Sequence, residues 1–154
     1  MPKIDIGKIP TDTRTGYPQP YDRVVVGRER KRLGNAAGLR QFGVNLTVLK
    51  PGASSALRHW HEREDEFIYL LEGELVLIED EGETVLKPGD AAGFKANSGN
   101  NGHHLVNKSD RNAVYLEVGT RSKHERVEYP EADLMVVRDD TGMRYTHKNG
   151  DPYE

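Results

Sequence analysis

The segment RHWHEREDEFIYLLEGE (residues 58–74) combines three patterns: two histidines one residue apart, an acidic turn, and an apolar run that ends in a glycine. In a β-strand, residues two apart project from the same face, about 7 Å apart along the chain. His59 and His61 are therefore expected to point one way, and Arg58 and Trp60 the other. One metal ion could bind both imidazoles.

A second strand is expected after the turn EREDE, with Glu66, Ile68 and Leu70 on one face and the intervening residues on the other. Glu66 would then begin this strand close to the histidine pair. A further histidine, His103, opens the short β-prone run HHLVN. Three imidazoles and one carboxylate suit Zn, Fe, Mn, Co or Ni and leave coordination positions for water or substrate. We therefore predict a site for one divalent transition metal ion, formed by His59, His61, Glu66 and His103.

His104 is an alternative to His103. A shift of one residue in the register of the strand would exchange the faces of these two neighbours. The turn residues Glu64 and Asp65 become ligand candidates only if the turn has a different structure from the one assumed. His124 and His147 lie in charged surroundings and are expected at the surface.

The rest of the chain also divides into short β-prone segments. Sixteen glycines and eight prolines separate them. A hairpin is predicted through Gly73 and a second turn at Gly82. Residues 27–39 (GRERKRLGNAAGL) are the one segment that could instead form a helix, although the glycines make this prediction weak. Many short strands with frequent turns predict an all-β sandwich or barrel. The strands are expected in QFGVNLTVL, EFIYLLEGELVLIED, ETVLKPGDAAGF, HHLVN and NAVYLEVG.

Composition narrows the classes of partner. The chain has 154 residues, 22 basic and 25 acidic side chains and a net charge of −3. This balance provides no basic field for nucleic acid or anionic lipid, so neither partner is expected. Without cysteine, any metal must be bound by nitrogen and oxygen. The first residues contain no apolar signal segment and no run is long enough to span a membrane, so a cytoplasmic protein is expected.

At this point the residues resemble the cupin superfamily. The first cupin motif is matched, with one extra residue after its first glycine, by Gly52, His59, His61, Glu66 and Gly73. The second motif is matched at its ends, by Gly89, His103 and Asn107, while its middle departs from the pattern and the loop FKANSGNNGHH is longer than the motif allows.

The resemblance implies a small single-domain cupin jelly roll, an all-β barrel or sandwich with an extended N-terminal arm. Residues 1–40 would form the arm and an edge segment, residues 41–120 the barrel core, and residues 121–154 a C-terminal extension packed on the barrel. This group of cupins includes proteins described as sugar phosphate isomerases and others with no established activity.

Two classes of function stay open. The first is a metal-dependent enzyme on a small oxygenated substrate, either an isomerase or a dioxygenase, with a decarboxylase also allowed by the ligand set. The second is a non-catalytic cupin that binds or senses a small molecule, and a purely structural jelly roll comes third. Polar residues inside the barrel would favour the enzyme. Candidates for substrate binding are Asn45, Tyr69 and Lys95, with Thr47 and Tyr115 as further polar candidates for the interior.

A homodimer is expected, because a lone jelly roll leaves sheet edges unpaired. The run YDRVVVG offers Val24–Val26 as a strand that would pair with a sheet edge of the partner. In the competing arrangement, the arm folds back on its own barrel.

Overall fold

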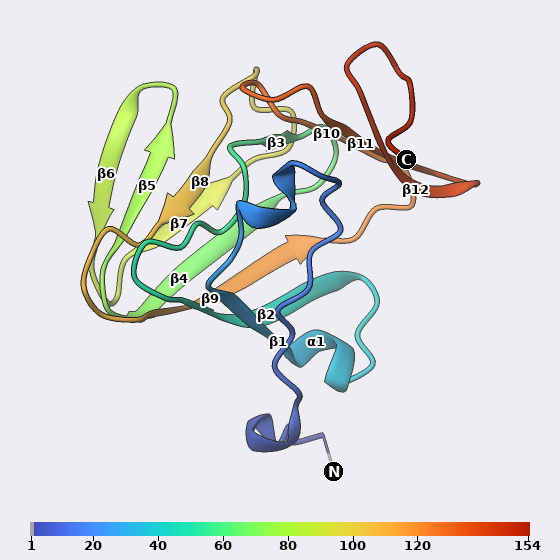
Figure 1. Ribbon diagram of the computed structural model, residues 1–154. Helices are drawn as coiled ribbons and strands as arrows, with labels where there is room; N and C mark the ends of the chain where they lie inside the picture. The colour runs from blue at the N-terminus through green and yellow to red at the C-terminus, as the bar shows by residue number, and fades with distance from the viewer. Residues whose placement is uncertain (1) are drawn as a thin grey trace.

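Two layers of antiparallel strands face each other in the computed structural model, which describes residues 2–154 (Figure 1). The first layer is a five-stranded sheet composed, in spatial order, of β1 (Arg28–Arg32), β2 (Phe42–Leu49), β9 (Ala113–Thr120), β4 (Glu66–Glu72) and β7 (Ala91–Phe94). This arrangement confirms the predicted all-β class, and the five segments from QFGVNLTVL to NAVYLEVG that were expected to contain the strands of the barrel all do so.

Two smaller sheets form the second layer. One contains β6 (Gly82–Leu86), β5 (Leu75–Glu79) and β8 (His104–Val106). The other contains β12 (Gly142–Thr146), β11 (Met135–Asp139), β10 (Glu125–Glu128) and β3 (Trp60–His61). Isolated bridges between His59 and His103 and between Ser54 and Val106 join the two sheets. These bridges bring the histidine-bearing segments of both sheets side by side.

The core lies between the layers and follows the expected alternation. On β4, Ile68 and Leu70 are buried, whereas Phe67 and Tyr69 are exposed on the outer face. A second apolar cluster lies beneath β10 and β11, where Tyr17 of the N-terminal arm packs against buried residues. The arm therefore completes the interior of its own chain.

Gly73 carries the chain from one layer to the other. The predicted β4–β5 hairpin is wrong, because β4 pairs with β7 and β9 whereas β5 pairs with β6 and β8. Gly73 has a φ of +80°, and a Cβ added there would lie 2.5 Å from the carbonyl oxygen of Asn112. Only glycine fits this crossing, since both the dihedral angle and the close backbone exclude a side chain. The second turn was predicted correctly: Glu79 and Gly82 are paired at the end of the β5–β6 hairpin.

Replacing Gly73 with alanine should destabilise the fold by about 3–5 kcal/mol, because strain at positive φ adds to an overlap with backbone that cannot move away. Gly52 is a matched control, since its φ is +83° and nothing lies within 4 Å of an added Cβ. Gly52→Ala should cost about 1–2 kcal/mol. Urea unfolding of both variants measures the difference, and equal losses would show that the crossing tolerates a side chain.

Two charged or mixed segments contain strands that the sequence patterns did not identify. Within residues 27–39, Arg28–Arg32 form strand β1, and only Leu33–Ala36 form a short helix, α1. Strand β1 pairs along its whole length with β2. Residues 121–154 contain three strands, β10 to β12, none of which the sequence patterns predicted.

The strand predicted over Val24–Val26 is also wrong. These residues form a turn after a short 3₁₀ helix (η2, Tyr21–Arg23), with Val25 buried and Val26 exposed. An earlier 3₁₀ helix (η1) spans Ile6–Lys8. The arm pairs with its own chain instead, through reciprocal backbone hydrogen bonds of 2.7 and 2.9 Å between Asp12 and Arg30. The homodimer itself stays a prediction. No helix in residues 2–154 is long and apolar enough to cross a membrane.

Candidate functional site

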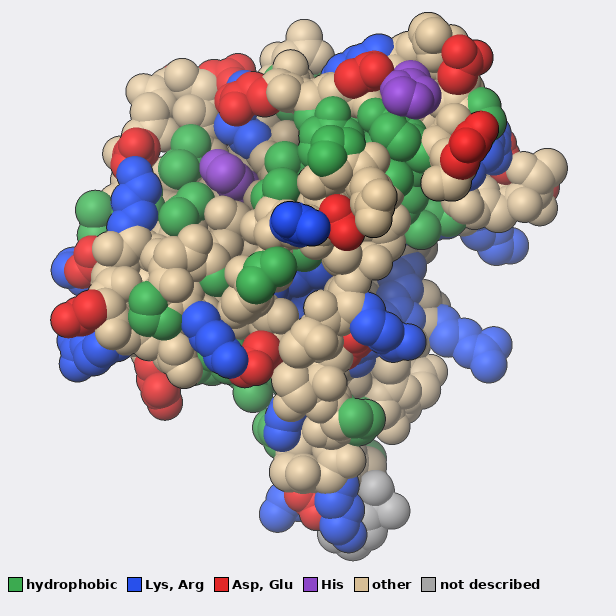
Figure 2. Space-filling model, viewed as in Figure 1, with side chains coloured by type: hydrophobic (Ala, Val, Ile, Leu, Met, Phe, Trp, Pro, Cys, Tyr) green, Lys and Arg blue, Asp and Glu red, His purple; other side chains and the backbone are tan. Residues whose placement is uncertain are grey.

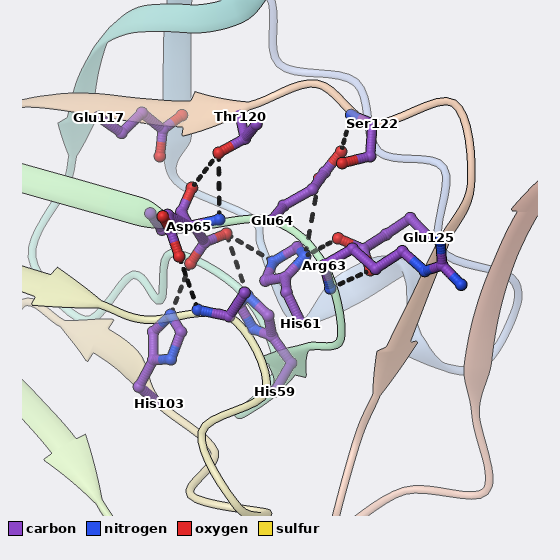
Figure 3. A network of polar contacts seen from close by, with 12 residues as sticks. His59, His61, Arg63, Glu64, Asp65, His103, Glu117, Thr120, Ser122 and Glu125 are labelled. Atoms are coloured by element: carbon purple, nitrogen blue, oxygen red, sulfur yellow. Dashed lines mark hydrogen bonds and ion pairs between the residues drawn. The ribbon is translucent and has the colours of Figure 1, made fainter.

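The predicted ligand residues converge between the two layers. His59 immediately precedes β3 and His61 is its last residue. Glu66 begins β4, and His103 immediately precedes β8. The Glu66 carboxylate lies 3.6 Å from Nε2 of His59, 2.6 Å from Nε2 of His61 and 2.6 Å from Nε2 of His103. Figure 3 shows the three imidazole rings directed toward a common point. The structure thus brings together all four residues predicted as ligands.

Neighbouring groups fix the orientation of two of these rings. Nδ1 of His59 lies 2.7 Å from the carbonyl oxygen of Leu57. Because a carbonyl can only accept a hydrogen bond, this nitrogen carries the proton and Nε2 presents its lone pair to the cluster. The ring of His103 stacks on Phe94 with 3.6 Å between ring centroids and 4° between planes. A hydrogen bond from the outer ring nitrogen to a carbonyl, as His59 makes, is typical of imidazoles that ligate a metal.

His61 has acidic groups on both sides. Its Nδ1 lies 3.4 Å from Glu125 and 3.8 Å from Glu64. Among the described residues, neither ring nitrogen of His61 has a hydrogen-bond partner of proper alignment, although both nitrogens are buried. Ligand atoms of His59, His61 and Glu66 lie within 4.8 Å of one another. Converging nitrogen and carboxylate atoms, some of them buried without a partner, fit a transition metal ion.

The charges of the cluster are strongly coupled. Burial alone would raise the pKa of Glu66, but the three surrounding imidazoles hold that pKa well below its usual range. Burial opposes a charge on His61, but the nearby carboxylates of Glu125 and Glu66 outweigh it and raise the pKa of His61 to about 10. Glu66 is therefore ionised at neutral pH and is available as an anionic ligand.

The alternative residue, His104, is not part of the cluster. Its Nδ1 donates to the carbonyl oxygen of Ala56 at 2.8 Å. The acidic residues of the turn lie around the cluster: Glu64 is buried and forms an ion pair of 3.0 Å with Arg138, and Asp65 accepts a hydrogen bond from the backbone of Ala96. The rings of His124 and His147 contact carboxylates of acidic residues elsewhere.

A cavity of about 400 Å³ opens beside the cluster, and all four candidate ligands line it. Asn45 and Tyr115, two of the polar residues considered for the interior, also line it. Tyr69 and Lys95 do not. Tyr69 lies on the outer face of β4 and Lys95 is exposed after the end of β7. The structure therefore corrects the placement of these two residues predicted to bind substrate.

The cavity also contains charged residues that the sequence patterns did not identify. Glu117 of β9 lines it and forms an ion pair with Arg30 of β1 at 2.6 Å. The same carboxylate accepts a hydrogen bond of 3.0 Å from the side chain of Asn45. Arg28, Arg30 and Arg32 all line the cavity, since the alternation of the run RERKR places these three residues on the inner face of β1. The alternation of arginine with other residues in RERKR is the sequence signal that could have identified these cavity residues.

Comparisons with known proteins agree with the all-β fold. A family model described as the cupin domain matches residues 45–119. The chain is similar to the crystal structure of a sugar phosphate isomerase from a cupin superfamily of Silicibacter pomeroyi, with a TM-score of 0.94 and 45% identity over 99% of this chain and 96% of that one. No curated protein matches the sequence significantly.

Two further solved structures are more distant. A protein from Acidithiobacillus ferrooxidans, provisionally described as a sugar phosphate isomerase, has a TM-score of 0.74 and 30% identity over 79% of this chain and 77% of that one. The polyketide cyclase RemF of Streptomyces resistomycificus has a TM-score of 0.64 and 20% identity over 78% and 79% of the two chains. The likeness to the cyclase concerns the fold alone.

Proposed function

The chain belongs to the cupin superfamily, and from this premise we propose that it is a metal-dependent sugar phosphate isomerase that interconverts a small aldose phosphate and its ketose form. The observation that carries the proposal is a second carboxylate, Glu117, on the wall of the cavity that holds the ligand cluster. Isomerisation of a hydroxy-carbonyl compound needs a base in addition to a group that stabilises negative charge on oxygen.

His59, His61, His103 and Glu66 would hold a divalent transition metal ion. Such an ion supplies Lewis-acid chemistry, which draws electron density from the carbonyl and hydroxyl oxygens of a bound substrate. Protein side chains must do the remaining work: they position the sugar, exclude water and move the proton.

Glu117 lies where it can move that proton. In the pairing of β4 with β9, Glu66 is opposite Gly119 and Glu117 is opposite Ile68. Glu66 and Glu117 are therefore diagonal neighbours on the inner face, with Cα atoms roughly 7–8 Å apart and Cβ atoms somewhat closer. This spacing leaves room for the reacting carbons of a sugar between the ligand cluster and the second carboxylate.

Glu117 would remove the proton from the carbon that bears the hydroxyl group, which leaves an enediolate. The protonated carboxyl group would then return the proton to the former carbonyl carbon, and a hydroxyl proton would move between the two oxygens. Arg30 and Asn45 hold the carboxylate in place through the ion pair and the hydrogen bond. An interior with such polar groups supports the enzyme rather than a cupin that only binds its ligand.

Proton exchange tests this function directly. The protein loaded with Zn, Mn, Fe, Co or Ni is incubated in D₂O with a panel of aldose and ketose phosphates of three to six carbons and followed by ¹H NMR. Deuterium should enter the carbon next to the carbonyl, and the two isomers should interconvert. Protein treated with a chelator is the control. Fully loaded protein that binds the sugar phosphates without exchange or isomerisation would support a non-catalytic binding cupin instead.

A further inference from the structure

Arg28 is a buried cation in the cavity. Its side chain lines the cavity wall, the residue is only 7% exposed, and no carboxylate in residues 2–154 forms an ion pair with it. It donates to the backbone carbonyl oxygens of Ser55 at 2.7 Å and Arg14 at 3.3 Å. A guanidinium has five N–H donors, so three of them are free for another acceptor.

The surroundings of Arg28 carry an excess of positive charge. Arg30 is paired with Glu117, and Arg32 shares Asp12 with Arg14. Near Arg28 there are thus four guanidinium groups, including Arg28 itself, but only two carboxylates, those of Glu117 and Asp12. One of the four, Arg14, lies mainly in solvent. Figure 2 shows basic side chains gathered around the middle of the face that carries the N-terminal arm. Burial and the neighbouring Arg30 lower the pKa of Arg28, so its charged form is not fully compensated by the protein.

Tyr115 adds a neutral donor to the same wall. It is fully buried, lines the cavity, and its hydroxyl group has no hydrogen-bond partner in residues 2–154. A buried hydroxyl group without a hydrogen-bond partner destabilises the folded protein. Phenylalanine would avoid that cost at the same position, and an acceptor on a bound ligand would remove it.

The arginines stand apart from the metal-ligand cluster. In the five-stranded sheet, β2 and β9 lie between β1 and β4. At about 4.8 Å per strand, the backbone of β1 lies roughly 14 Å from that of β4. A substrate that reaches both ends of the cavity would place its reacting carbons beside the cluster and its far end beside β1.

We propose that Arg28 and the Tyr115 hydroxyl group bind the phosphoryl group of the substrate. The inference rests on the proposed function, since it assigns the far end of the same substrate. A phosphate monoester carries a charge of −1.5 to −2 at pH 7, and Arg28, a buried guanidinium without a carboxylate partner in residues 2–154, would offset part of that charge. The planar fork of arginine also matches two phosphate oxygens at once.

The test uses inorganic phosphate and protein freed of metal by a chelator, so that binding is measured without any contribution from an ion. Phosphate is titrated at constant ionic strength and followed by ³¹P NMR. Wild-type protein should bind saturably. Arg28→Gln should lower the affinity at least tenfold, and Tyr115→Phe about three- to tenfold. Tyr115→Phe removes a hydroxyl group that holds nothing in the fold, so this variant should remain folded even if Arg28→Gln does not.

Arg40→Gln is the matched control, because it removes the same charge from an exposed arginine in the loop before β2. Its affinity for phosphate should equal that of the wild type. Three outcomes would overturn the assignment. Phosphate binding could fail to saturate, Arg28→Gln and Arg40→Gln could lose the same phosphate affinity, or folded Tyr115→Phe could bind phosphate as tightly as the wild type. Saturable binding of acetate in place of phosphate would also overturn it. Phosphate binding through Arg28 in a protein that catalyses no isomerisation would refute the proposed function alone.

Discussion

Alanine at His59 or at His103 should leave the protein nearly free of transition metal, whereas the wild type should purify with close to one ion per chain. Each substitution removes one of three converging imidazoles from the Glu66 carboxylate. Even the loss of a residue that only supports a metal ligand costs 10- to 100-fold in affinity, so the loss of a ligand should cost roughly 100-fold or more. Elemental analysis after dialysis, with protein concentration determined independently, gives the number of ions per chain.

His104→Ala is the control for His103→Ala. The two residues are adjacent, and His104 donates to a backbone carbonyl outside the cluster. His104→Ala should retain the ion. The assigned site is wrong if the first two variants keep their metal, and the register of β8 is wrong if the metal is lost with His104 instead of His103.

The convergence of His59 and His61 on Glu66 could be predicted from the sequence because strand geometry is regular. Residues two apart share a face, so the spacing of His59 and His61, followed by Glu66 at the start of the next strand, already defined a common direction. The same rule could have excluded Tyr69. It is three residues from Glu66 on β4 and therefore faces outward, as its exposure shows.

The positive side of the cavity was harder to predict. The run RERKR contains no apolar residue, and a strand is usually recognised by hydrophobic alternation. Arginine can line an interior because its long stem packs while its guanidinium reaches a partner. The partners, Glu117 and Asp12, are 87 and 20 residues away from Arg30 and Arg32, respectively. Sequence patterns contain no information about such long-range pairs.

Glu117 and the last three strands were missed for related reasons. In NAVYLEVG, the glutamate interrupts an apolar run, and the local pattern does not distinguish it from an ordinary solvent-facing residue of a strand. Strands β10 to β12 contain several charged residues, and only some of their positions are buried. Their apolar residues pack against Tyr17 of the arm. These strands are therefore stabilised by tertiary contacts more than by their own propensity.

Glutamine at Glu117 should abolish isomerisation while the metal content stays at the wild-type level. The amide is close in size to the carboxylate and can still accept a hydrogen bond from Asn45, but it cannot remove a proton. General bases contribute about 10²- to 10⁴-fold to rate, so kcat should fall roughly 1000-fold with a small change in KM. Deuterium entry into the substrate should disappear to the same extent.

The loss of charge at Glu117 also leaves the partly buried Arg30 without its partner, which costs stability. The double variant Glu117→Gln/Arg30→Gln removes that complication. Thermal unfolding should show it to be more stable than Glu117→Gln alone, and its kcat should stay as low. Glu117→Asp, which keeps a shortened carboxylate, should recover part of the rate. If folded, metal-loaded Glu117→Gln retains more than a tenth of the wild-type kcat, the base is another residue of the cavity.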